Sequence, residues 1–83
     1  MTTKVKVLLI EDDRSISNFI TTALDSNGYK VIAATGGKEG ISLAASVCPD
    51  IVLLDLGLPD IDGIEVLKQT AKKNNRRKQL LAA

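Results

Sequence analysis

Two apolar patterns alternate along the chain. Segments rich in apolar residues at 4–10, 30–34 and 51–54 predict three short strands. The first and third are expected to be buried on both faces of a parallel sheet. Between these runs, apolar residues recur every three or four positions, which predicts one helix in each gap. The recurring positions are Ile16, Phe19, Ile20, Ala23 and Leu24 in the first gap, and Ile41, Ala44, Ala45 and Cys48 in the second.

Polar residues, glycine and proline mark the ends of these elements. Asp12-Asp13 or Ser15 can cap the first helix, and Gly28 stands where a helix-ending glycine is expected. Pro49 ends the second helix. A third helix is predicted to begin near Gly63 or Ile64, after a loop that follows the third strand.

This alternation predicts an α/β fold with right-handed crossovers. The elements read βαβαβα, and a flavodoxin-like arrangement would place the strands in the order 2-1-3. With 83 residues, the chain forms one small domain, of a size that is marginally stable without a ligand or partner.

The net charge of the chain changes from negative to positive near residue 68. Residues 1–67 carry ten acidic and five basic side chains, a net charge of −5, whereas residues 68–83 carry six basic side chains and no acid. We therefore expect a domain over residues 1–68 and a basic tail over residues 69–83, which either extends the last helix or is disordered. A charge run of this kind is more often solvated than bound to nucleic acid.

Composition excludes several classes of site. The chain has one cysteine, Cys48, and no histidine, so disulfides, zinc sites and Ser-His or Cys-His nucleophile pairs are excluded. Apolar residues make up 45% of the chain without a membrane-length run or signal-peptide pattern, so a cytoplasmic location is expected.

Carboxylates follow two of the predicted strands. Glu11 and Asp12 end the first strand and Asp55 ends the third. In the order 2-1-3 these strands are neighbours, so their acids should converge at the edge where α/β sheets bind ligands. Carboxylate oxygens suit Mg²⁺, and a carboxylate beside that ion can act as a nucleophile toward a phosphoryl group.

Three segments resemble the receiver domain of bacterial two-component response regulators. They are Val7–Asp13, Pro49–Leu56 and Leu58–Gly63, and the resemblance covers roughly residues 4–68. The surrounding residues look most like the DNA-binding, winged-helix-linked branch of the family, including its potassium- or turgor-responsive members.

The resemblance implies a role for each residue of the site. Asp55 would accept a phosphoryl group from a phosphohistidine on a sensor kinase. Asp12 would bind Mg²⁺ directly, Glu11 through water, and Asp55 and the backbone carbonyl of Gly57 would complete the protein ligands. Asp13 is interpreted mainly as a helix cap. DNA would be contacted only through an effector domain that this sequence does not contain.

Other parts that the resemblance implies cannot be placed in this sequence. A receiver continues through a fourth strand ending in Ser or Thr and a fifth ending in Lys, whose side chains contact the phosphoryl oxygens. Without them, phosphoryl transfer is expected to be impaired. The third strand would also be left as an exposed sheet edge, so we expect the sheet to be completed by a homodimer through that edge or through helix 3.

Three functions remain open from the sequence. The first is a phosphoacceptor signalling module, which is not an enzyme in its own right. The second is a truncated receiver that does not transfer phosphate and acts as a homodimer or as a binding decoy. The third is a Mg²⁺-dependent aspartyl phosphatase, which ranks last because Gly57 stands where that class carries a second acid.

Overall fold

The computed structural model describes residues 4–55, Lys68 and residues 79–82. Its strands are β1 (Lys6–Ile10), β2 (Lys30–Ala34), β3 (Ile51–Leu54) and β4 (Gln79–Ala82), and its described helices are α1 (Arg14–Ser26) and α2 (Gly37–Val47). The predicted third helix and the basic segment before β4 fall almost wholly outside the described residues, so these predictions are not tested.

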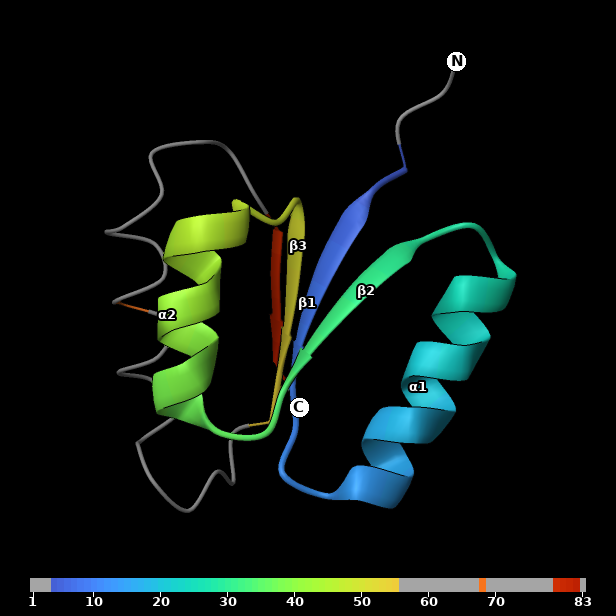
Figure 1. Cartoon of the computed structure of the whole chain (residues 1–83), viewed down its shortest axis with the longest axis horizontal. Helices are drawn as coiled ribbons and strands as arrows, with labels where there is room; N and C mark the ends of the chain where they lie inside the picture. Colours follow the sequence, from blue (N-terminus) through green and yellow to red (C-terminus); the bar gives the residue numbers. More distant parts are fainter. Residues whose placement is uncertain (1–3, 56–67, 69–78, 83) are drawn as a thin grey trace.

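The strands form one parallel sheet in the order β2-β1-β3-β4. The predicted α/β class and the order 2-1-3 are therefore confirmed. Figure 1 shows α1 and α2 on opposite sides of the sheet, which is the layering that alternating strands and helices produce. No helix within the described part of the chain is long and apolar enough to cross a membrane.

The fourth strand corrects two expectations. Residues 79–82 were expected in a helical or disordered tail, but they pair in parallel with β3, from Ile51 opposite Gln79 to Leu54 opposite Ala82. Consequently β3 is paired on both sides and is not an exposed edge, which removes the reason for expecting a dimer there. A homodimer through helix 3 stays a prediction. The physical reason is that an apolar strand with a free edge has unpaired backbone groups, and even a short neighbouring strand satisfies them.

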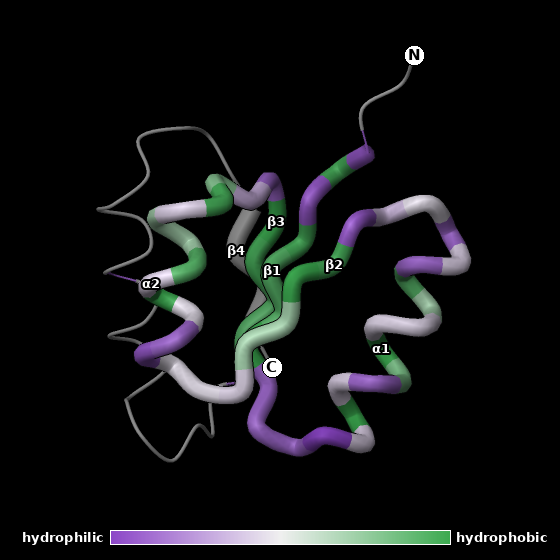
Figure 2. Tube along the Cα trace, viewed as in Figure 1, coloured by the Kyte–Doolittle hydropathy of each residue, from purple (hydrophilic) through white to green (hydrophobic). Residues whose placement is uncertain are grey.

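The main core lies between the sheet and α2. Leu8, Ile10, Val52 and Leu54 project from the sheet onto this side and are almost completely buried, together with residues of α2. Figure 2 shows the hydrophobic strands in the middle of the molecule, with polar and apolar residues interspersed along both helices. This core fixes β1 and β3 side by side, and it therefore fixes whatever follows their carboxyl ends.

Helix α2 approaches the sheet closely at one glycine. A Cβ added to Gly40 would lie 2.7 Å from Cγ1 of Ile10, closer than real atoms pack. Helix propensity alone disfavours a glycine inside a helix, but here its missing side chain makes room for Ile10. Ile41 and Ala44 are buried as predicted, whereas Ala45 is exposed.

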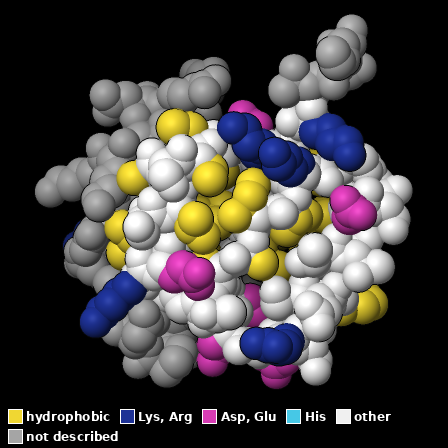
Figure 3. Space-filling view, viewed as in Figure 1, with side chains coloured by type: hydrophobic (Ala, Val, Ile, Leu, Met, Phe, Trp, Pro, Cys, Tyr) yellow, Lys and Arg dark blue, Asp and Glu magenta, His cyan; other side chains and the backbone are white. Residues whose placement is uncertain are grey.

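Helix α1 covers its side of the sheet less completely. Ile20 and Leu24 are half-buried, but Ile16 and Phe19 are 48% and 75% exposed. Hydrophobic side chains also reach the surface in the middle of the face in Figure 3, between the two helices. The helical period was therefore predicted correctly, although it did not show which of the apolar positions would be covered.

Candidate functional site

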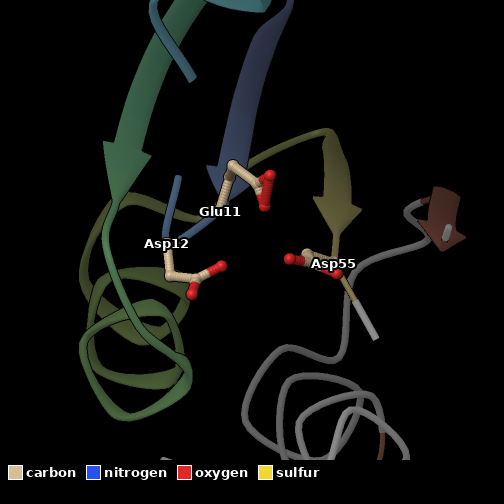
Figure 4. Close-up of side chains that lie close together, drawn as sticks. All are labelled: Glu11, Asp12 and Asp55. Carbon is tan, nitrogen blue, oxygen red and sulfur yellow. The ribbon is translucent and has the colours of Figure 1, made fainter. Parts of the chain in front are cut away.

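The acidic site lies at the carboxyl-terminal edge of the sheet. Glu11 and Asp12 follow β1, and Asp55 follows β3. Because Ile10 and Leu54 are paired in the parallel register, the next residues of both strands emerge at the same edge. Figure 4 shows the side chains of Glu11, Asp12 and Asp55 directed into the space between the two strand ends.

The three carboxylates lie close enough to share one cation. Each offers an oxygen, and these oxygens all lie within 4.8 Å of one another. Their exposure differs, since Glu11 is buried, Asp55 is half-buried and Asp12 is exposed. The convergence predicted for these three side chains is thus present, with Asp12 on the solvent side. Gly57, the fourth predicted ligand, lies outside the described residues.

Backbone hydrogen bonds hold the acidic residues in place. The Glu11 N–H donates to the Ala34 carbonyl on β2, with an N–O distance of 3.1 Å. The Asp55 N–H donates to the Ile10 carbonyl at 3.0 Å, which extends the pairing of β1 and β3 by one residue. Sheet pairing therefore continues up to the site and orients the first atoms of both side chains.

Asp13 has a separate structural role. Its side chain accepts a hydrogen bond from the backbone N–H of Ile16 at 3.1 Å, and it is the N-cap of α1. An N-cap of this kind satisfies one of the free donors in the first turn of a helix. The interpretation of Asp13 as a cap is confirmed.

Glu11 has a strongly shifted pKa. Burial, a side-chain hydrogen bond with Asp55 and the negative charges of Asp55, Asp12 and Asp13 raise the pKa of Glu11 to about 7. Its Oε2 atom is buried and has no hydrogen-bond partner among the described residues. Each of these effects favours the protonated form of Glu11, which reduces the repulsion among the acids.

These features fit a divalent cation with a preference for oxygen ligands. Three clustered carboxylates supply hard donors, and the site has an unsatisfied buried oxygen. Mg²⁺ binds through one or two protein carboxylates and retains several waters, so an open, partly exposed cluster suits it better than a closed cage would.

A family model for the response regulator receiver domain matches residues 7–81. The chain belongs to this receiver family. The match includes both halves of the acidic site and β4, so it extends past the boundary near residue 68 that the charge distribution suggested.

Curated relatives of this receiver domain are transcriptional regulators. The chain is 45% identical over 62 residues to the KDP operon transcriptional regulatory protein KdpE of Escherichia coli, covering 75% of the chain and 28% of that protein. It is 42% identical over 64 residues to the alkaline phosphatase synthesis transcriptional regulatory protein PhoP of Bacillus subtilis, covering 77% and 27%. The chain thus spans just over a quarter of the length of these relatives.

Solved receiver structures have the same fold. The non-phosphorylated HemR receiver domain of Leptospira biflexa is 31% identical, with a TM-score of 0.84 over 96% of this chain and 65% of that one. A CheY-like receiver of Methylobacillus flagellatus, at 21% identity, supports the fold with a TM-score of 0.90, covering 96% and 69%.

Sequence reasoning identified the clustered acids but missed two features around them. It did not place β4, whose four residues Gln79–Ala82 are too few to show a clear period. It also did not anticipate the raised pKa of Glu11. A signal for this was present, because Glu11 directly follows an apolar run and has acidic neighbours in the sequence.

Proposed function

We propose that this receiver domain is a phosphoacceptor module of a two-component system. Asp55 accepts the phosphoryl group, and Glu11, Asp12 and the carbonyl of Gly57 hold Mg²⁺. The observation that carries the proposal is the convergence of three carboxylates after two neighbouring parallel strands, in a chain of the receiver family.

Each side chain contributes according to its position. Asp55 is half-buried at the end of β3, where a carboxylate oxygen can reach a donor from solvent. Asp12 faces solvent and offers a ligand oxygen to an entering cation. Bound Mg²⁺ would supply positive charge that offsets the repulsion between the acids and an incoming phosphoryl group. That charge would favour the deprotonated form of Glu11, which is the form that can hold the ion.

The phosphodonor and the downstream partner follow from the family. A sensor histidine kinase would supply the phosphoryl group from a phosphohistidine. The curated relatives regulate transcription, so we propose that any contact with DNA is made by an effector segment outside this chain. In this scheme the chain receives a signal and is not an enzyme with a substrate of its own.

A small phosphodonor tests the proposal directly. The chain is incubated with acetyl phosphate and Mg²⁺, and the intact mass is measured. We expect a phosphoryl adduct that disappears in Asp55→Asn and persists in Asp25→Asn, which changes an exposed acid on α1. An unchanged adduct in Asp55→Asn would show that another residue is modified.

A second function is a module that binds Mg²⁺ without accepting phosphate. It is favoured by the sequence of β4, because neither Gln79–Ala82 nor Ala83 contains the hydroxyl that the family carries at the end of this strand. Mg²⁺ binding without an adduct would support this function, which corresponds to a decoy. Steady release of phosphate would instead support the aspartyl phosphatase.

A further inference from the structure

The end of α1 carries a dipeptide that is chemically reactive in proteins. Asn27 caps the helix and is followed by Gly28, and the other asparagines, Asn18, Asn74 and Asn75, do not precede a glycine. Both residues are exposed. Gly28 has a φ of +88°, and a Cβ added to it would meet nothing within 4 Å. Because Gly28 has no side chain, nothing on that residue hinders attack by its backbone nitrogen.

Hydrogen bonds in the last turn nevertheless hold the reacting groups apart. The Asn27 side-chain amide donates from Nδ2 to the Ala23 carbonyl at 2.7 Å. The Gly28 N–H donates to the Asp25 carbonyl, and the Tyr29 N–H donates to the Leu24 carbonyl, both at 3.1 Å. For the Gly28 nitrogen to attack the Asn27 side chain, the bonds of both groups must first break.

We propose that Asn27 is a site of spontaneous deamidation whose rate is set by opening of the last turn of α1. The Gly28 nitrogen loses its proton to solvent base and forms a bond to Cγ of Asn27. The Cγ–Nδ2 bond breaks and ammonia leaves with a proton from solvent. Water then opens the resulting succinimide at either carbonyl, which gives aspartate or isoaspartate. Neither step involves oxidation or reduction.

The products should disturb the junction between α1 and β2. A carboxylate at residue 27 adds negative charge beside Asp25 at the carboxyl end of a helix, where the helix dipole disfavours it. Isoaspartate also lengthens the main chain ahead of Lys30, whose N–H donates to Val5 at the start of the β1–β2 pairing. The acidic site is separate from this chemistry, because it adjoins the opposite end of α1.

The test is an incubation of the full chain at mildly alkaline pH, followed by peptide mapping that separates aspartate from isoaspartate. A peptide with the sequence of residues 26–30 serves as the reference, because it lacks the hydrogen bonds of the last turn of α1. We expect Asn27 to convert before Asn18, Asn74 and Asn75, and about tenfold more slowly than in the peptide, as a turn of modest stability would give. Conversion of another asparagine first, or a rate equal to that of the peptide, would overturn the proposal.

A matched pair of variants separates local opening from global unfolding. Ala23→Gly weakens α1 one turn before Asn27, whereas Ala45→Gly introduces the same change at an exposed position of α2. We expect Ala23→Gly to accelerate conversion about fivefold and Ala45→Gly to leave the rate unchanged. Equal acceleration by both variants would show that global unfolding controls the reaction, and would contradict the proposal.

Discussion

At the scale of single residues, Glu11 belongs both to the sheet and to the acidic site. It is the first residue after β1, and its N–H still belongs to the sheet while its carboxyl group belongs to the acidic site. A carboxyl group in this position is buried by the strand ends around it and lies beside other acids. Both effects favour the protonated form. The placement that brings Glu11 into the acidic site therefore also raises its pKa.

The raised pKa of Glu11 predicts a pH dependence of stability without metal. Below pH 4.5 Glu11 is protonated in both the folded and the unfolded chain. Between pH 4.5 and about 7 the unfolded chain loses this proton while the folded chain keeps it, so the free energy of unfolding falls as pH rises. Above about pH 7 Glu11 is deprotonated in both the folded and the unfolded chain, so it causes no further decrease in the free energy of unfolding. Urea unfolding of wild type and Glu11→Gln across this range should show the decrease in wild type and its absence in the variant.

Asp12 is expected to affect metal binding rather than folding. It is exposed, so Asp12→Asn should leave the urea midpoint nearly unchanged and weaken Mg²⁺ binding by about tenfold or more. Calorimetric titration with Mg²⁺ measures the affinity. Asp13→Asn is the matched control, because asparagine is as good an N-cap as aspartate and Asp13 is not one of the clustered ligands. Equal losses in both variants would argue against direct ligation by Asp12.

At the scale of elements, the packing of α2 on β1 explains why a poor helix former stands inside a helix. Gly40 is buried against Ile10, the last residue of β1 before the acidic site. Helix propensity favours alanine over glycine by about 1 kcal/mol, whereas forcing a methyl group into a filled core costs about 1–3 kcal/mol. The steric cost exceeds the gain in propensity.

Gly40→Ala is therefore expected to destabilise the domain, against its helix propensity. The expected net loss is about 1 kcal/mol in the free energy of unfolding, measured by urea denaturation. Ser42→Ala, at an exposed position of the same helix, should stabilise slightly or have no effect. A stabilising Gly40→Ala would mean that α2 can move away from Ile10 at little cost.

At the scale of the whole molecule, β4 covers the edge of β3. It pairs with β3 over four residues and covers an edge that would otherwise expose unpaired backbone N–H and C=O groups. The strand that lies beside the phosphoacceptor candidate therefore comes from the last residues of the chain. This arrangement links the stability of the acidic site to a segment that is distant in sequence.

Removing β4 should destabilise the chain and cause self-association. A chain that ends at Lys78 lacks the strand that pairs with β3, so its urea midpoint should fall and sedimentation should show oligomers at micromolar concentration. A chain that lacks Ala83 is the control and should behave like wild type. If both shortened chains remain equally stable monomers, β4 does not protect the β3 edge.

The sequence determined the elements that depend on local pattern. The ranges 30–34 and 51–54 were predicted as strands and are β2 and β3, and Gly28 was predicted as the helix end and has a positive φ. The identity of the clustered acids could also be predicted, because parallel strands that are neighbours bring their carboxyl ends to one edge. Such features follow from hydrophobic periodicity and turn chemistry, which are properties of adjacent residues.

Tertiary structure alone decided the features that depend on distant neighbours. The four residues of β4 carry too little pattern to be recognised, and they form a strand because β3 offers an unpaired edge. Gly40 is required because Ile10 lies against it, and the pKa of Glu11 is raised because burial and Asp55 disfavour its charge. In each case the cause is a contact between residues far apart in the chain, which only the folded structure brings together.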